Sequence, residues 1–138
     1  MPAAELSEVE LELTVDATSV AEARGAVAEM ARNVGAPVQG VSLATSEAVT
    51  NSVIHGFRGR DEGRIVVRAR VERDAMVVEV TDDGIGMVPN LNTPGLGLGT
   101  SLISQVSREA KFQSSDEGTT VTMVFDLVPD LAESERAR

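Results

Sequence analysis

A polar stripe on a predicted helix holds the side chains best suited to acid–base or metal chemistry. Glu47, Asn51 and His55 recur every four residues, so at about 100° per residue they fall on one arc of the helix. Apolar Val41 and Ile54 fall on the same arc, where an unpaired charge is costly. The stripe therefore marks a functional site, a buried polar network, or simply a broad helix boundary.

A carboxylate ends one of the predicted strands. Asp82 continues the row of alternate apolar residues that begins at Met76, so it stands where an apolar residue is expected. An ionised carboxylate can accept hydrogen bonds from a flat amino group such as that of adenine. Gly84 and Gly86 would let a ligand ring approach the backbone. The alternative is an ordinary turn at Asp83-Gly84.

A second glycine-bearing segment precedes a predicted helix. Gly95, Gly97 and Gly99 alternate with leucines immediately before it. Free amides and the positive end of a helix dipole suit phosphate oxygens, so these glycines are candidate phosphate contacts. The segment follows a proline-bearing loop rather than a strand, and so it is not the dinucleotide fingerprint. A flexible hinge is the alternative.

The third glycine-bearing segment opens the last predicted strand. Gly118 is followed by Thr119, which begins the alternate row that runs through Val121 to Leu127 and is expected to face the core. The Thr119 hydroxyl should therefore point towards the same layer as Asp82. A tight turn into an edge strand would explain Gly118 equally well.

Composition excludes several classes of function. The 138 residues contain no cysteine, so disulfides and thiolate chemistry are excluded, and Lys111 is the single lysine, so no P-loop is present. A net charge of −10 and only three aromatic residues argue against direct nucleic-acid binding. No apolar run approaches the length of about 20 residues that a membrane span needs, and the acidic start shows no secretory signal. A cytoplasmic protein is expected.

The order of predicted elements indicates an α+β fold. The chain suits one domain over residues 1–128 with a charged tail at 129–138. We expect a mixed, mostly antiparallel sheet with helices on one face, in two layers. Thr18 or Ser19 is the expected cap of the first helix. The expected strands are 9–15, 65–72, 76–82, 110–114 and 119–127, and the expected helices are 18–33, 38–57 and 98–108.

These features in this order resemble the GHKL nucleotide-binding superfamily, which includes gyrase and the histidine kinases. The segment 46–57, Ser-Glu-Ala-Val-Thr-Asn-Ser-Val-Ile-His-Gly-Phe, is especially similar to the anti-sigma-factor serine/threonine protein kinase branch. The resemblance covers about residues 9–127 and implies the histidine-kinase-like ATPase fold. It also implies ATP and Mg²⁺ as ligands.

The resemblance assigns roles residue by residue. Glu47 matches the general base, and Asn51 matches the magnesium ligand. Asp82 matches the adenine-recognition aspartate, and Thr119 matches the last adenine contact. His55 lies one turn beyond Asn51 and either orients it or is a packing residue. The glycines beneath the base and beside the phosphates are Gly84, Gly86, Gly95, Gly97 and Gly99.

The implied function is an ATP-dependent kinase of a partner-switching system. Such a protein holds an RNA polymerase sigma factor inactive and phosphorylates a small anti-sigma antagonist protein. The family also implies a homodimer formed through the first strand and its neighbours. One alternative is a binding module that uses nucleotide only to set its affinity for a partner. Another is a stand-alone relative of the histidine kinase ATP-binding domain. The segment 87–94 is short and has no basic residue, which predicts fast nucleotide exchange and modest affinity.

Overall fold

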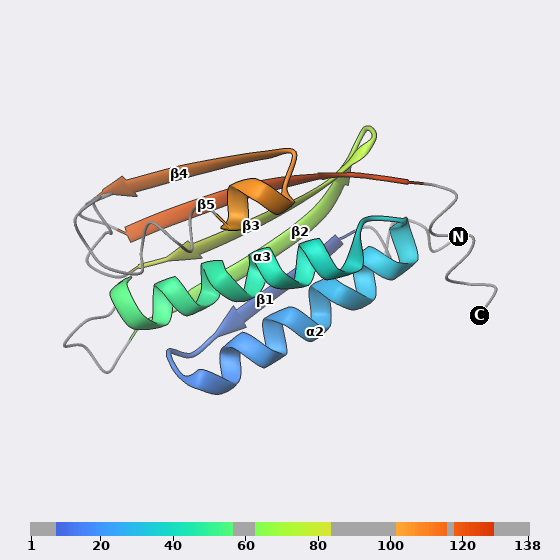
Figure 1. Ribbon diagram of the computed structural model, residues 1–138. Helices are drawn as coiled ribbons and strands as arrows, with labels where there is room; N and C mark the ends of the chain where they lie inside the picture. Colours follow the sequence, from blue (N-terminus) through green and yellow to red (C-terminus); the bar gives the residue numbers. More distant parts are fainter. Residues whose placement is uncertain (1–7, 57–62, 84–101, 116–117, 129–138) are drawn as a thin grey trace.

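Five antiparallel strands form one sheet in the computed structural model, which describes residues 8–56, 63–83, 102–115 and 118–128 (Figure 1). The strand order is β1-β2-β3-β5-β4. A short helix at 102–106 precedes β4. The labelled elements are β1 (Glu8–Leu13), α2 (Ala17–Val34), α3 (Val38–Asn51), the π-helix η1 (Ser52–Gly56), β2 (Ile65–Glu72), β3 (Ala75–Asp82), β4 (Glu109–Ser115) and β5 (Gly118–Asp126).

The helices cover one face of this sheet. Figure 1 shows α2 and α3 side by side across the strands, with the short helix 102–106 next to α3. Alternation along the strands explains this arrangement, because Met76, Val78 and Val80 of β3 are fully buried beneath the helices. The predicted α+β, two-layer fold with helices on one face is confirmed. None of the described helices is long and apolar enough to cross a membrane.

The opposite face of the sheet is charged. Arg68 of β2 pairs with Glu10 of β1 at 3.3 Å, and Arg70 pairs with Glu79 of β3 at 2.7 Å. Partly exposed pairs of this kind contribute little to stability, but they match charge across neighbouring strands. The buried core of the sheet therefore lies on the helical side.

The first helix begins earlier than the sequence predicted. Asp16 is its N-cap, since its carboxylate accepts hydrogen bonds from the backbone N–H of Thr18 at 2.7 Å and from the Thr18 hydroxyl. The prediction of Thr18 or Ser19 as the cap is therefore wrong. Ser19 instead donates its hydroxyl to the Thr14 carbonyl. Because this carbonyl bonds to the helix, β1 ends at Leu13 and does not include residues 14 and 15 as predicted.

Two other predicted helices change at their ends. The helix predicted over 38–57 is α-helical only to Asn51, and the π-helical turn η1 follows it. The helix predicted over 98–108 ends at residue 106, because the backbone N–H of Arg108 donates to the Val124 carbonyl of β5 at 2.7 Å. Residues 98–101 and the tail 129–138 lie outside the described residues.

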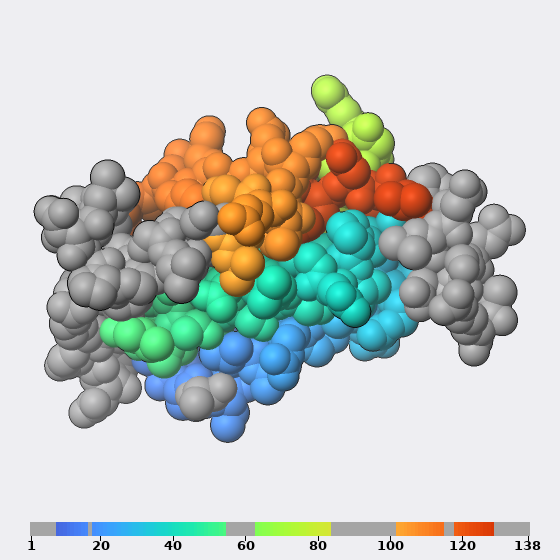
Figure 2. Space-filling view, viewed as in Figure 1, coloured from blue at the N-terminus to red at the C-terminus, as the bar shows by residue number. Residues whose placement is uncertain are grey.

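A glycine lets the short helix pack closely on α3. A Cβ at Gly40 would lie 3.4 Å from the Val106 carbonyl oxygen, already at van der Waals contact. Ile103 of the short helix is fully buried, and Figure 2 shows the atoms of this helix resting against α3. The short helix is therefore fixed beside the flank of α3 that carries the predicted stripe.

Candidate nucleotide site

Helix α3 places the predicted stripe at the edge of its buried face. Asn51 is buried and 7% exposed, and Glu47 is half-buried. Ile54, which was expected on the same buried arc, is 56% exposed, whereas Thr45 is fully buried. The buried face is thus rotated away from Glu47 relative to the prediction, and Glu47 lies between the core and solvent.

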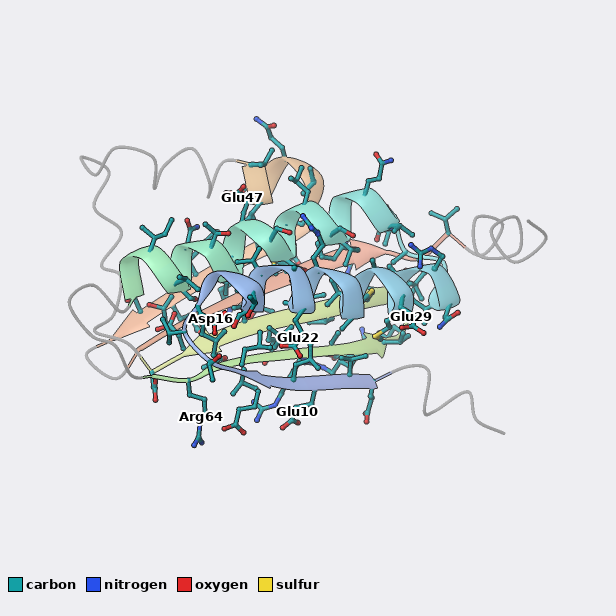
Figure 3. All side chains as sticks on the ribbon, turned by 90° about the horizontal axis from the view of Figure 1, so that it is seen from below. Glu10, Asp16, Glu22, Glu29, Glu47 and Arg64 are labelled. Atoms are coloured by element: carbon teal, nitrogen blue, oxygen red, sulfur yellow. The ribbon has the colours of Figure 1, made fainter. Side chains whose placement is uncertain are left out.

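The flank that carries Glu47 faces the short helix. Figure 3 shows Glu47 on the side of α3 away from α2, beside the short helix 102–106. A half-buried carboxylate at such a boundary can contact both a bound nucleotide and an incoming protein. This exposure is compatible with the role that the sequence predicts for Glu47.

Asp82 is held at the end of β3 by a side chain from the helical layer. Both Asp82 and Ser52 are almost fully buried, with 3% and 2% exposure. The Ser52 hydroxyl donates to Asp82 Oδ2 at 2.7 Å. The sequence patterns did not identify Ser52 as a site residue. The available signal was its position, directly after Asn51 of the stripe and on the apolar side of the helix.

Thr119 lies directly opposite Asp82 in the sheet. The two residues are a cross-strand pair of β3 and β5, both buried on the helix-facing side. The expectation that the Thr119 hydroxyl points to the same layer as Asp82 is confirmed. The Thr119 hydroxyl also shares a hydrogen bond of 3.2 Å with the Ser114 hydroxyl of β4, a contact that no local pattern predicts.

Gly118 allows the ends of β3 and β5 to approach closely. Its φ of +137° is a conformation that side-chain-bearing residues rarely adopt. A Cβ there would overlap the Asp82 carbonyl oxygen, and it would lie 2.9 Å from the Asp82 carbonyl carbon. Gly118 opens β5 opposite Ser115 at the end of β4, as the alternative of a tight turn expects, but β5 is not an edge strand because it lies between β3 and β4.

A pocket of about 290 Å³ opens at these strand ends. Asp82 and Thr119 line it together with Gly118. The volume approaches the lower end of the range for small-molecule sites. Its other described lining residues are Thr81, Gln113, Ser114 and Thr120. Because Thr81, Gln113 and Thr120 alternate along their strands with Asp82, Ser114 and Thr119, the pocket is bounded by residues of both faces at the strand ends.

The predicted phosphate side and metal site are described only in part. Gly84, Gly86, Gly95, Gly97 and Gly99 lie outside the described residues, and so does the side chain of His55. Within the described residues no group of three acidic, histidine or cysteine side chains could hold a metal ion. Asn51 fits a single oxygen ligand, so a Mg²⁺ ion bound there would need nucleotide phosphates and water for its remaining ligands.

The chain matches one protein-family model across most of its length. The model describes a histidine kinase-like ATPase domain and matches residues 13–125. The match includes the complete described pocket and helix α3. It also spans the sheet from the end of β1 almost to the end of β5.

Individual relatives point to the same family. An anti-sigma F factor of Clostridium beijerinckii is 40% identical over 50 residues, which cover 36% of this chain and 35% of that protein. A serine-protein kinase RsbW of Listeria monocytogenes is 32% identical over 102 residues, covering 62% of this chain and 64% of that protein. The chain therefore spans less than two thirds of the length of these relatives.

Solved structures are also similar. The RsbU and RsbW domains of Rv1364c from Mycobacterium tuberculosis match with a TM-score of 0.66 and 26% identity, covering 87% of this chain and 32% of that one. The histidine kinase domain of a blue-light-activated kinase from Erythrobacter litoralis matches with a TM-score of 0.57 and 27% identity, covering 73% of this chain and 50% of that one. On the extent of the family match and on these relatives, the chain belongs to the histidine kinase-like ATPase domain family.

Proposed function

We propose that this chain is an ATP-dependent serine/threonine protein kinase that acts as an anti-sigma factor in a partner-switching system. The observation that carries the proposal is the buried pair of Asp82 and Thr119, next to a helix that presents buried Asn51 and half-exposed Glu47. Base recognition and phosphoryl transfer require different environments. This arrangement offers a dry acceptor for the base and a more accessible carboxylate for the transfer.

The adenine end of the site is proposed at Asp82. Membership of an ATPase domain family implies ATP binding. The exocyclic amino group of adenine is a donor, and an ionised carboxylate is an acceptor, so the two are complementary. Burial at 3% exposure removes competing water from this contact. The neighbouring Thr119 hydroxyl can donate or accept a further hydrogen bond at the ring.

The transfer end of the site is proposed at Glu47. The hydroxyl oxygen of a serine or threonine attacks the γ-phosphorus of ATP, the bond to the β-γ bridging oxygen breaks, and ADP leaves. Glu47 takes the hydroxyl proton as general base. Such a base contributes about 10²–10⁴-fold to the rate. Because Glu47 is half-buried rather than enclosed, a hydroxyl on another protein can approach it.

Asn51 is proposed to hold a magnesium ion with the nucleotide. When bound, Mg²⁺ supplies neutralisation of the charge that develops on the phosphate oxygens. Asn51 contributes an uncharged side-chain oxygen from the edge of the buried face, which suits a hard cation that keeps most of its other ligands from phosphate and water. The segments with Gly84, Gly86, Gly95, Gly97 and Gly99 are proposed to contact the base and phosphates through their backbone.

The proposed partners follow from the names of the relatives. The clostridial relative is an anti-sigma F factor, and the Listeria relative is a serine-protein kinase. We therefore propose that this chain binds a sigma factor and phosphorylates a small antagonist protein. A homodimer is also proposed. β1 is an edge strand of the described sheet, pairing there with β2 alone, so its other edge is available to a second copy.

The experiment that tests the proposal is phosphotransfer from γ-labelled ATP and Mg²⁺ into a soluble extract of the source organism. Wild type would be compared with Glu47→Gln, which keeps the shape of the side chain and removes its basic carboxylate. Glu22→Gln, at an exposed position on α2, is the matched control. We expect wild type and the control to label one small protein on serine or threonine. Labelling by Glu47→Gln should fall by about 10²-fold or more.

Nucleotide binding separates the possible outcomes. Equilibrium dialysis with ATP should give similar affinities for wild type and Glu47→Gln, since the base acts on the protein hydroxyl rather than on the nucleotide. Loss of ATP binding in Glu47→Gln would contradict the assigned role. ATP binding without any Glu47-dependent label would favour the nucleotide-gated binding module instead of a kinase.

A further inference from the structure

A buried hydrogen bond joins the helical layer to the base end of the proposed nucleotide site. The Ser52 hydroxyl donates to Asp82 Oδ2 at 2.7 Å, across 30 residues of sequence. Both side chains are at least 97% buried, Ser52 with 2% exposure and Asp82 with 3%. A hydroxyl–carboxylate bond in such a dry environment is strong and directional. It fixes the orientation of the carboxylate plane.

The backbone of Ser52 is itself fixed at the junction of α3 and η1. Its N–H is shared between the carbonyls of Ala48 and Val49. π-helical turns of this kind occur frequently at functional sites. Ser42, on the same helix, behaves differently, because its hydroxyl donates locally to the Val38 carbonyl at 2.7 Å. The Ser52 hydroxyl thus bonds to a residue of the sheet, whereas the Ser42 hydroxyl bonds to a carbonyl of its own helix.

We propose that Ser52 is a positioning residue for base selection, whose hydroxyl holds the Asp82 carboxylate as the acceptor for the 6-amino group of a bound adenine. The inference rests on the proposed function, since it needs a nucleotide base at Asp82. A carboxylate has two oxygens and about four lone-pair sites. Occupation of one site on Oδ2 by a donor restrains the direction in which the remaining sites point.

The test compares two nucleotides on three proteins. ATP carries the 6-amino group, and purine riboside triphosphate lacks it while keeping the ring, ribose and phosphates. Wild type, Ser52→Ala and the matched control Ser42→Ala would be titrated with each nucleotide in the presence of Mg²⁺. Alanine is smaller than serine and is the best helix former, so both variants are expected to fold. Circular dichroism would verify this.

We expect Ser52→Ala to weaken ATP binding by about tenfold and purine riboside triphosphate binding by less than about twofold. Ser42→Ala should change neither affinity. Equal losses for both nucleotides, or an unchanged preference for ATP, would overturn the role of Ser52. A wild-type protein that binds the two nucleotides equally would instead contradict the proposed adenine site at Asp82. The failure of the inference is therefore distinguishable from the failure of the proposed function.

Discussion

Replacement of Gly118 by alanine should disturb the site from within the sheet. Gly118 has φ +137°, and an added Cβ would overlap the Asp82 carbonyl oxygen and lie 3.1 Å from the Asp83 Cα. No side-chain rotation can relieve this overlap, because the atoms in the way belong to the backbone. The ends of β3 and β5 would have to part by roughly 1.5 Å to restore normal contact distances.

The expected magnitude has two components. A non-glycine residue held in an unfavourable backbone conformation destabilises the folded protein by about 1–3 kcal/mol, and overpacking destabilises it by a similar amount. We therefore expect Gly118→Ala to lower the free energy of unfolding by about 2–6 kcal/mol. Displacement of a binding group by 1 Å can reduce function by about 10²-fold. Since Asp82 moves with its carbonyl, ATP affinity should fall at least tenfold.

The assays are urea denaturation and ATP titration, with a second glycine as control. A Cβ at Gly25 in α2 would meet nothing within 4 Å. Gly25→Ala should therefore stabilise the protein by about 0.5–1 kcal/mol and leave ATP affinity unchanged. The reasoning would be refuted if Gly118→Ala unfolded at the wild-type urea concentration and bound ATP with the wild-type affinity.

Two further substitutions test other features of the helical layer. Thr45 is fully buried, and its hydroxyl has no hydrogen-bond partner among the described residues. Thr45→Val should therefore raise the free energy of unfolding in urea by about 1 kcal/mol. Thr120→Val, which breaks a hydroxyl contact with Thr81, should bring no such gain. Hydrogen bonds from the side chain of Thr18, then from Thr14 and the Thr18 backbone, lower the pKa of Asp16. The carboxylate therefore stabilises the fold above its ordinary pKa, and Asp16→Ala should lower the urea midpoint at pH 7. That difference should shrink as the pH falls through the lowered pKa of Asp16, and a difference independent of pH would contradict the cap.

Strand positions were predictable from the sequence because they depend on a two-residue period. The rows through Met76 and Asp82, and through Thr119 and Val121, lie on the buried face as that period requires. Helix ends were less predictable. The change from α3 to η1 after Asn51 leaves no mark in the apolar pattern. In this turn Ser52 bonds to Asp82 of the sheet, a contact between segments that lie far apart in the sequence.

The residues of the candidate site also differ in how predictable they were from the sequence. The row of Asp82 and its layer followed from the sequence, since each depends on a single strand. Ser52 and Ser114 did not, because each bonds to a residue on a different element. The importance of Gly118 was also hidden, since its close neighbour is the backbone of Asp82, 36 positions earlier in the sequence. Contacts between distant segments require the register of the sheet.

Consecutive residues on one helix link the two ends of the proposed site. Asn51 and Ser52 differ by about 100° around the helix, so their side chains point in different directions from adjacent positions of the backbone. Ser52 points to the sheet and bonds to Asp82, while Asn51 remains at the edge of the buried face. The hydrogen bond therefore fixes the distance between the proposed magnesium ligand and the proposed adenine acceptor. A nucleotide that contacts both must match this fixed distance, so its base and its phosphates should contribute to binding in a coupled rather than an additive way.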